Sequence, residues 1–299
     1  ARISAEMDTI LKAQGYAEGT VGERMKALGE DPRYGFEDSD AGRQAILDEY
    51  TRLLEEIAKR MPEVFATIPP QKLEVVRVPK FSEAGSAGAY YNAPAMDGSR
   101  PGRFFANLRD VKETPKWSMK TLAYHEGIPG HHFQISTAQN LDLPLARSRL
   151  PFTAYTEGWA LYAEQVAYEI GMYENDPLGD LGRLQAELFR AVRLVVDTGM
   201  HYKKWSREQA IQYMIDTSGM AEGDVTAEIE RYAVMPGQAC AYKIGMLKIL
   251  EIREKAKAAL GDKFDLKKFH SAVLDNGPLP LTVLEKVIDQ WVETQKGGA

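Results

Sequence analysis

Apolar residues recur at helical spacing along most of the chain. Between residues 40 and 60 they follow one another at intervals of three or four, as Ile46, Tyr50, Leu53 and Ile57. Such spacing gives an α-helix one apolar face. Ser206 and Gln209 have the form of a capping box at the start of a similar stripe. The same pattern predicts further helices over residues 152–168, 177–200, 224–235, 238–259 and 279–294.

One stretch of the chain has a different pattern. Residues 73–78 are rich in β-branched side chains and lie between prolines, which predicts a strand. Residues 88–91 and 103–106 are two more candidate strands, separated by the turn-rich segment 97–102. The pattern therefore predicts one mainly α domain over residues 1–299, with a small β-sheet before the histidine cluster described below.

Composition narrows the class of protein. Apolar residues make up 44% of the chain and charged residues 27%, as in ordinary globular proteins. The net charge is −6 and the basic residues are scattered, so we expect no nucleic-acid partner. No apolar run is long enough for a transmembrane segment. Cys240 is the sole cysteine, which excludes an intrachain disulfide. The compartment stays open between cytoplasm and periplasm, and the chain reads as a piece of a longer protein.

Three of the five histidines fall within eight residues. His125 is followed directly by Glu126, and His131 and His132 come after Gly127-Ile128-Pro129-Gly130. Imidazole is the commonest metal ligand among side chains, and a carboxylate beside such a ligand supplies a general base. The cluster therefore predicts a metal site of the hydrolytic kind.

The spacing of these histidines leaves the second ligand open. On a simple zinc helix the second histidine follows the first at i+4, but here that position is Pro129. The second ligand is then His131 or His132. If residues 127–130 bulge by two residues, His131 takes the place of the i+4 ligand, and we favour it over His132.

A third ligand is expected from the helix predicted over residues 152–168. Glu157 and Glu164 fall on the same face of that helix. Apolar neighbours on this face argue against two solvated carboxylates. We expect Glu157 to bind the metal and Glu164 to hold one of the histidines. Two histidines and a glutamate are a usual ligand set for catalytic Zn²⁺.

These residues match a known family. Residues 125–134 together with 156–164 closely resemble DUF885, a bacterial family of unknown function that is itself similar to the helical gluzincin metallopeptidases. Members are usually about twice as long as this chain, which resembles their C-terminal, metal-bearing half. The likeness extends through the stretches 90–91, 97–102, 195–201 and 231–245.

The resemblance implies a gluzincin-like, multi-helix fold in which His125, His131 or His132, and Glu157 bind zinc, with Glu126 as the base. Residues 157–160 (Glu-Gly-Trp-Ala) are similar to the Glu-Gly-Phe-Ala type segment that carries the third ligand in gluzincins. The Gly130-His131 pair is similar to the end of many gluzincin zinc helices, which again favours His131.

Further site residues follow from the same resemblance. Related helical peptidases stabilise the oxyanion with a tyrosine and a histidine from late helices, for which Tyr242 and His201 are the candidates. The strand that contains Tyr90 is expected to pair with a peptide backbone. Arg231 and Lys243 are candidates for holding a substrate carboxylate.

The sequence thus favours a zinc-dependent peptidase that acts on short or unfolded peptides, with a missing N-terminal half that closes the cleft over the metal. The alternative is a non-catalytic module that has kept its metal site. A di-iron protein is disfavoured because no histidine follows a glutamate by three residues. Nucleotide-binding and serine-hydrolase motifs are absent from the sequence.

Overall fold

The computed structural model describes residues 1–144, 147 and 150–297. The protein is mainly α, as predicted. Its three strands are β1 (Leu73–Arg77), β2 (Ala89–Asn92) and β3 (Gly102–Ala106). Its helices are α1 (Arg2–Ala13), α2 (Val21–Gly29), α3 (Asp40–Ala58), α4 (Met119–Glu126), α5 (His131–Gln139), α7 (Thr153–Glu169), α8 (Pro177–His201), α9 (Arg207–Ser218), α10 (Glu222–Val234), α11 (Ala241–Leu260), α12 (Leu266–Leu274) and α13 (Leu281–Gly297).

The helices begin where local signals place them. Ser39 caps α3, because its side chain accepts a hydrogen bond from the backbone N–H of Gly42. Ser206 and Gln209 form the predicted capping box at the start of α9. All the predicted helices are present. Helices α1, α2, α4, α5 and α12 lie outside the predicted ranges.

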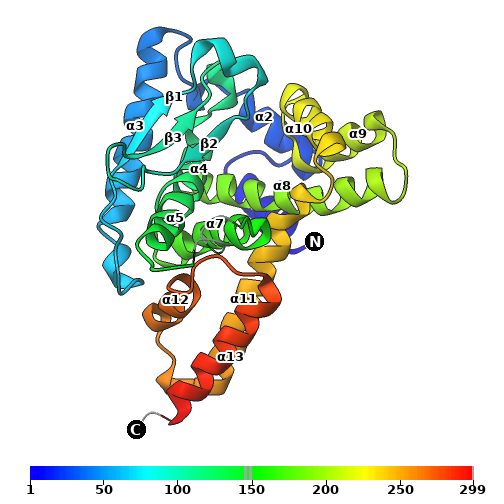
Figure 1. The fold of residues 1–299 in the computed structure, drawn as a ribbon. Coiled ribbons are helices and arrows are strands. Elements are labelled where there is room, and N and C mark those ends of the chain that lie inside the picture. The colour runs from blue at the N-terminus through cyan, green and yellow to red at the C-terminus, as the bar shows by residue number, and fades with distance from the viewer. Residues whose placement is uncertain (145–146, 148–149, 298–299) are drawn as a thin grey trace.

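The three predicted strands form one sheet in the order β1-β3-β2. Strand β1 runs parallel to β3, with Leu73 opposite Gly102, and β2 runs antiparallel, with Ala89 opposite Ala106. Helix α3 packs against β1, and α4 packs against β2 (Figure 1). Strand β2 is therefore an edge strand whose outer side has no strand partner within the described residues.

Two apolar cores divide the molecule. The first joins α3, the sheet, α4, α5, α7, α11, α12 and α13. The second joins α1, α2, α8, α9 and α10. Helices α11, α12 and α13 lie together towards the C-terminus, and α9 and α10 lie apart from them beside α8 (Figure 1). Elements of both cores line the cavity described below. None of the described helices has the length and apolar character that a membrane crossing demands.

Helices α7 and α11 cross in close contact at a pair of glycines. A Cβ atom added to Gly158 would lie 2.4 Å from the Cα of Gly245, and one added to Gly245 would lie 1.9 Å from the carbonyl oxygen of Ala154. No larger residue fits either position without a backbone shift. The crossing brings Glu157, next to Gly158, close to Tyr242, one turn before Gly245.

A buried hydrogen-bond chain anchors α12. His270 is fully buried; its Nδ1–H donates to the carbonyl of Val64 at 2.8 Å, and its Nε2 accepts from the hydroxyl of Tyr162 at 2.8 Å. Arg253 donates to the same hydroxyl at 3.1 Å. Burial lowers the pKa of His270 to about 3. The ring is therefore neutral at physiological pH.

We expect Gly245→Ala to destabilise the fold by about 1–3 kcal/mol, because the added methyl group overpacks the α7–α11 crossing. Gly223→Ala is the matched control, since a Cβ atom at this exposed position of α10 meets open space. The control should be neutral or slightly stabilising. Urea unfolding of both variants checks the prediction, and equal stabilities would contradict it.

His270 should make stability depend on pH. Its folded-state pKa lies below the unfolded value, so the neutral ring stabilises fully above about pH 6.5, and this stability is lost as the pH falls towards 3. Between pH 7 and pH 5 the wild type should lose about 2 kcal/mol more unfolding free energy than His270→Gln. Denaturant titrations at both pH values measure this difference. Equal losses would show that His270 does not carry the linkage.

Candidate metal centre

The chain breaks between two helices at the histidine cluster. Helix α4 ends at Glu126 and α5 begins at His131, so the expected bulge within one zinc helix is wrong. The break brings the rings of His125 and His131 together, with centroids 4.8 Å apart. Gly130 allows it, because a Cβ atom there would lie 1.9 Å from the carbonyl oxygen of His125. A tight turn, instead of a bulge, thus brings His131 beside His125.

Helix α7 holds this turn in place. The indole N–H of Trp159 donates to the carbonyl of Pro129 at 2.9 Å, and both groups are buried. Phe65 packs against Phe133 of α5 and against Trp159, with ring centroids 4.5 and 6.2 Å away. The aromatic residue two positions after Glu157 therefore fixes the segment that positions His131.

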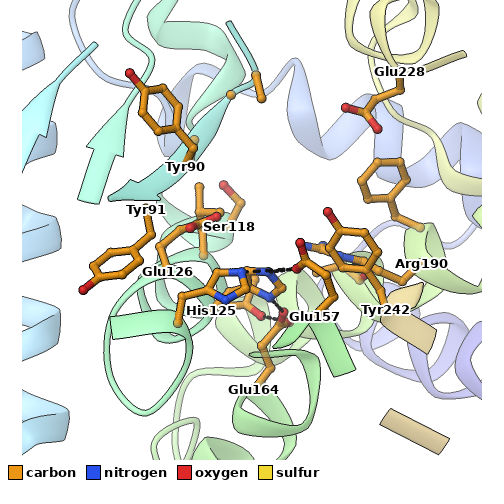
Figure 2. A pocket seen from close by; sticks show the side chains of 18 of the residues that line it. Tyr90, Tyr91, Ser118, His125, Glu126, Glu157, Glu164, Arg190, Glu228 and Tyr242 are labelled. Atoms are coloured by element: carbon orange, nitrogen blue, oxygen red, sulfur yellow. Dashed lines mark hydrogen bonds and ion pairs between the residues drawn. The ribbon is translucent and has the colours of Figure 1, made fainter. Parts of the chain in front are cut away.

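Three side chains converge at the break (Figure 2). The Nε2 atoms of His125 and His131 lie 3.7 and 3.2 Å from the same oxygen of Glu157. One ligand atom from each residue lies within 4.8 Å of the other two. A tetrahedral ion with ligands about 2.1 Å away separates neighbouring ligand atoms by about 3.4 Å. This Glu157 oxygen is buried and accepts no hydrogen bond from the described residues. The donor set and its spacing therefore fit a zinc ion.

A second carboxylate orients His125. The Nδ1–H of His125 donates to Glu164 at 2.8 Å, and Thr121 donates to the other oxygen of that carboxylate. This hydrogen bond leaves Nε2 to face Glu157. Metal-binding histidines are commonly oriented by such a carboxylate. The expectation that Glu164 holds a histidine is confirmed.

His132 faces away from this cluster. Its Nε2–H donates to the carbonyl of Gln71 at 3.1 Å, and its Nδ1 accepts from the hydroxyl of Tyr91 at 2.9 Å. Both ring nitrogens are thus engaged. Burial lowers the pKa of His132 to about 4, so the ring stays neutral. The structure brings His131, rather than His132, together with His125 and Glu157.

The electrostatics of the cluster are those of a cation site. Burial opposes a charge on His125, but the carboxylates of Glu157 and Glu164 outweigh it and raise its pKa to about 9. Burial also opposes a charge on Glu157, yet His131 and His125 hold the pKa of that carboxyl well below its usual range. The pKa of Glu164 is lowered too, where the charge of Arg190 is the main cause that overcomes burial. Carboxylates and positive charge thus stabilise each other here.

The cluster opens into a cavity of about 600 Å³. Its walls come from β2, α4, α5, α7, α8, α10 and α11. Glu126 lines it, and no described residue forms a hydrogen bond or ion pair with its carboxylate. Tyr242 lines it as well, with its ring 6.1 Å from that of His125. Tyr90, from the edge strand β2, lies on the other side of the cavity (Figure 2).

The other predicted residues are placed differently. His201 is exposed at the end of α8, does not line the cavity, and donates from Nε2 to the carbonyl of Tyr232 at 2.9 Å. Lys243 is buried against Glu187 at 2.5 Å and does not line the cavity either. Neither side chain is brought to the site. Arg231 does line the cavity, but its guanidinium is bonded to Glu228 and Gln238.

Sequence reasoning missed several residues of α8 and α10 that line the cavity. Arg190 and Arg193 come from α8, and Glu228 comes from α10. Glu228 accepts hydrogen bonds from Arg193, Arg231 and Tyr232. Both arginines follow the helical pattern of ordinary surface residues, and no local motif singles them out. The one feature of the sequence that could have pointed to them is that they precede residues 195–201, a stretch that carries the family resemblance, on the same predicted helix.

The comparisons with known proteins identify the family of the chain. The family described as a bacterial protein of unknown function (DUF885) matches residues 1–288, so the chain belongs to this family. No curated protein is similar enough to count as a match.

Among the solved structures that resemble the chain, two are described as a "putative lipoprotein". The one from Colwellia psychrerythraea has a TM-score of 0.96 and 57% identity, covering 98% of this chain and 50% of that one. The one from Shewanella oneidensis, of unknown function, has a TM-score of 0.82 and 22% identity, covering 96% and 54%. The second likeness shows the fold alone. The chain spans about half the length of both proteins.

We expect Glu164→Gln to weaken zinc binding by about 10- to 100-fold, because the glutamine loses the charge that orients and polarises His125. Glu55→Gln is the control, a change of the same kind at an exposed position of α3. Competition with a chromophoric chelator measures the affinity of each folded variant. Unchanged affinity in Glu164→Gln would remove this carboxylate from the metal site.

Proposed function

We propose that this chain is the metal-bearing part of a zinc-dependent peptidase that acts on short or unfolded peptides. The observation that carries the proposal is the convergence of His125, His131 and Glu157 beside Glu126, a carboxylate without a partner among the described residues. This combination stands in a cavity of about 600 Å³, large enough for several residues of a peptide. The resemblance to gluzincins supports the same reading.

Zinc held by His125, His131 and Glu157 would supply Lewis acidity and lower the pKa of water towards 7. Glu126 is placed to accept a proton from the water that attacks the substrate carbonyl, and to return it to the leaving amine as the C–N bond breaks. Its freedom from ion pairs keeps the carboxylate available for both transfers.

Tyr242 is the candidate for stabilising the oxyanion. Its hydroxyl accepts a hydrogen bond from Gln238 at 3.3 Å, which leaves its own proton free to donate to the substrate oxygen. The glycine crossing of α7 and α11 holds it in this place. The exposed position of His201 gives it no part in this proposal.

Strand β2 supplies the means to hold a peptide. Its outer edge has no strand partner among the described residues, and Ala89, Tyr90 and Tyr91 line the cavity. An extended substrate can add to this edge as a further strand. Because the solved relatives are about twice as long, the proposal includes a second half of the protein that closes the cavity.

Glu126→Gln tests the mechanism. The amide cannot accept the proton, so turnover of peptides should fall by about 10²- to 10⁴-fold while the zinc content stays unchanged. Glu222→Gln, an exposed change on α10, is the control and should keep full activity. Peptide-library cleavage followed by mass spectrometry, with zinc measured on the same samples, gives the result. Undiminished turnover in Glu126→Gln would end the mechanism, and absence of cleavage by the wild type would favour a non-catalytic metal module.

A further inference from the structure

Arg190 is the unusual cation of the cavity. It lies on α8 and lines the cavity. Its Nη1 donates only to the carbonyl of Ala186, one turn earlier on the same helix, at 3.2 Å. Its Nε is buried and has no hydrogen-bond partner among the described residues. No carboxylate of those residues lies within ion-pair distance. A guanidinium usually forms charge-assisted hydrogen bonds with an anion, and Arg190 forms none with the described residues.

The two other arginines of the lining are both ion-paired with Glu228. Arg193 donates to Glu228 at 2.8 Å and to the hydroxyl of Tyr232 at 2.7 Å. Arg231 donates to the same carboxylate at 2.8 Å. The fold thus supplies Glu228 to both of these arginines, whereas Arg190 has no carboxylate within ion-pair distance among the described residues. The charge of Arg190 acts on Glu164 only at longer range, so its guanidinium can still bind an anion that enters the cavity.

Arg190 lies close to the metal cluster. Its guanidinium carbon is 6.0 Å from the centre of the Tyr242 ring, and that ring stacks beside His125. Figure 2 shows Arg190 and Tyr242 together, on the side of the cavity opposite Tyr90 and Tyr91. A peptide held along β2 therefore reaches Arg190 after passing the metal cluster.

We propose that Arg190 binds the C-terminal carboxylate of the peptide, which makes the protein a carboxypeptidase; this rests on the peptidase function proposed above. The planar guanidinium fork matches a carboxylate in shape and charge. One arginine balances the single negative charge of a carboxylate, whereas a phosphoryl group carries nearly two. The bond that breaks is one of the last peptide bonds, and water supplies the new C–O bond. The released fragment carries the carboxylate that Arg190 held.

The test compares three N-acetylated peptides. Two have one sequence, as the free acid and as the C-terminal amide, and the third is the amide of the same sequence with glutamate as its last residue. Their binding to zinc-loaded Glu126→Gln protein is measured by calorimetry, so that no cleavage interferes. The same measurements are made after adding Arg190→Gln or Arg190→Lys. Arg207→Gln, which removes an exposed charge on α9, is the control for net charge.

We expect the free acid to bind about tenfold or more tightly than either amide. Arg190→Gln should abolish this preference without weakening the amides, Arg190→Lys should keep part of it, and Arg207→Gln should keep all of it. Equal binding of acid and amide overturns the inference, as does a preference that survives Arg190→Gln. Equal weakening of all three peptides also overturns it, because that pattern means a general electrostatic effect. If the glutamate amide binds as well as the free acid, the α-carboxylate is not what Arg190 selects.

Cleavage of the same peptides is then measured with proteins that retain Glu126, with and without Arg190→Gln. This assay separates the inference from the proposed function. Arg190-dependent binding of the free acid without cleavage of any peptide supports the carboxylate site and contradicts the peptidase. Equal cleavage of the acid and the amide, unchanged by Arg190→Gln, supports the peptidase and contradicts the carboxylate site.

Discussion

The hydrogen bond from the indole of Trp159 to the carbonyl of Pro129 fixes the geometry on which the site depends. It ties α7 to the turn between α4 and α5, where the chain must change direction to bring His131 beside His125. The same helix supplies Glu157 to face both rings and Glu164 to orient one of them. One helix therefore gives the proposed third ligand, the carboxylate that orients His125, and the hydrogen bond that holds the turn. This explains why the two conspicuous motifs of the chain occur together.

The surrounding fold extends this centre into a cavity. Gly158 and Gly245 let α7 and α11 approach closely enough to set Tyr242 against the histidine cluster. The second core contributes α8 and α10, whose arginines and Glu228 form the opposite wall. Strand β2 closes another side with an edge free for pairing. The candidate metal ligands therefore lie on the side of the first core, and the arginines lie on the side of the second.

Much of this could be predicted from the sequence, because helical periodicity and turn residues are local signals. The three strands, the capping box at Ser206 and the pairing of Glu164 with a histidine were all within reach. The sequence also favoured His131 over His132, but the contacts that turn His132 away could not be predicted, since Gln71 and Tyr91 are distant in sequence. Lys243 resembled a substrate ligand until Glu187, on another helix, proved to neutralise it. No local pattern marks Arg190. It differs from Arg193 only in that Arg193 forms an ion pair with Glu228, which lies on another helix.

The most direct test of the account is the zinc content of the purified wild type beside His131→Ala and His132→Ala, after equilibration with zinc. We predict about one zinc per chain in the wild type and in His132→Ala, and its loss from folded His131→Ala. Circular dichroism of each sample establishes that the variants are folded. A wild type that binds no zinc, or a folded His132→Ala that loses the metal while His131→Ala keeps it, would contradict the account.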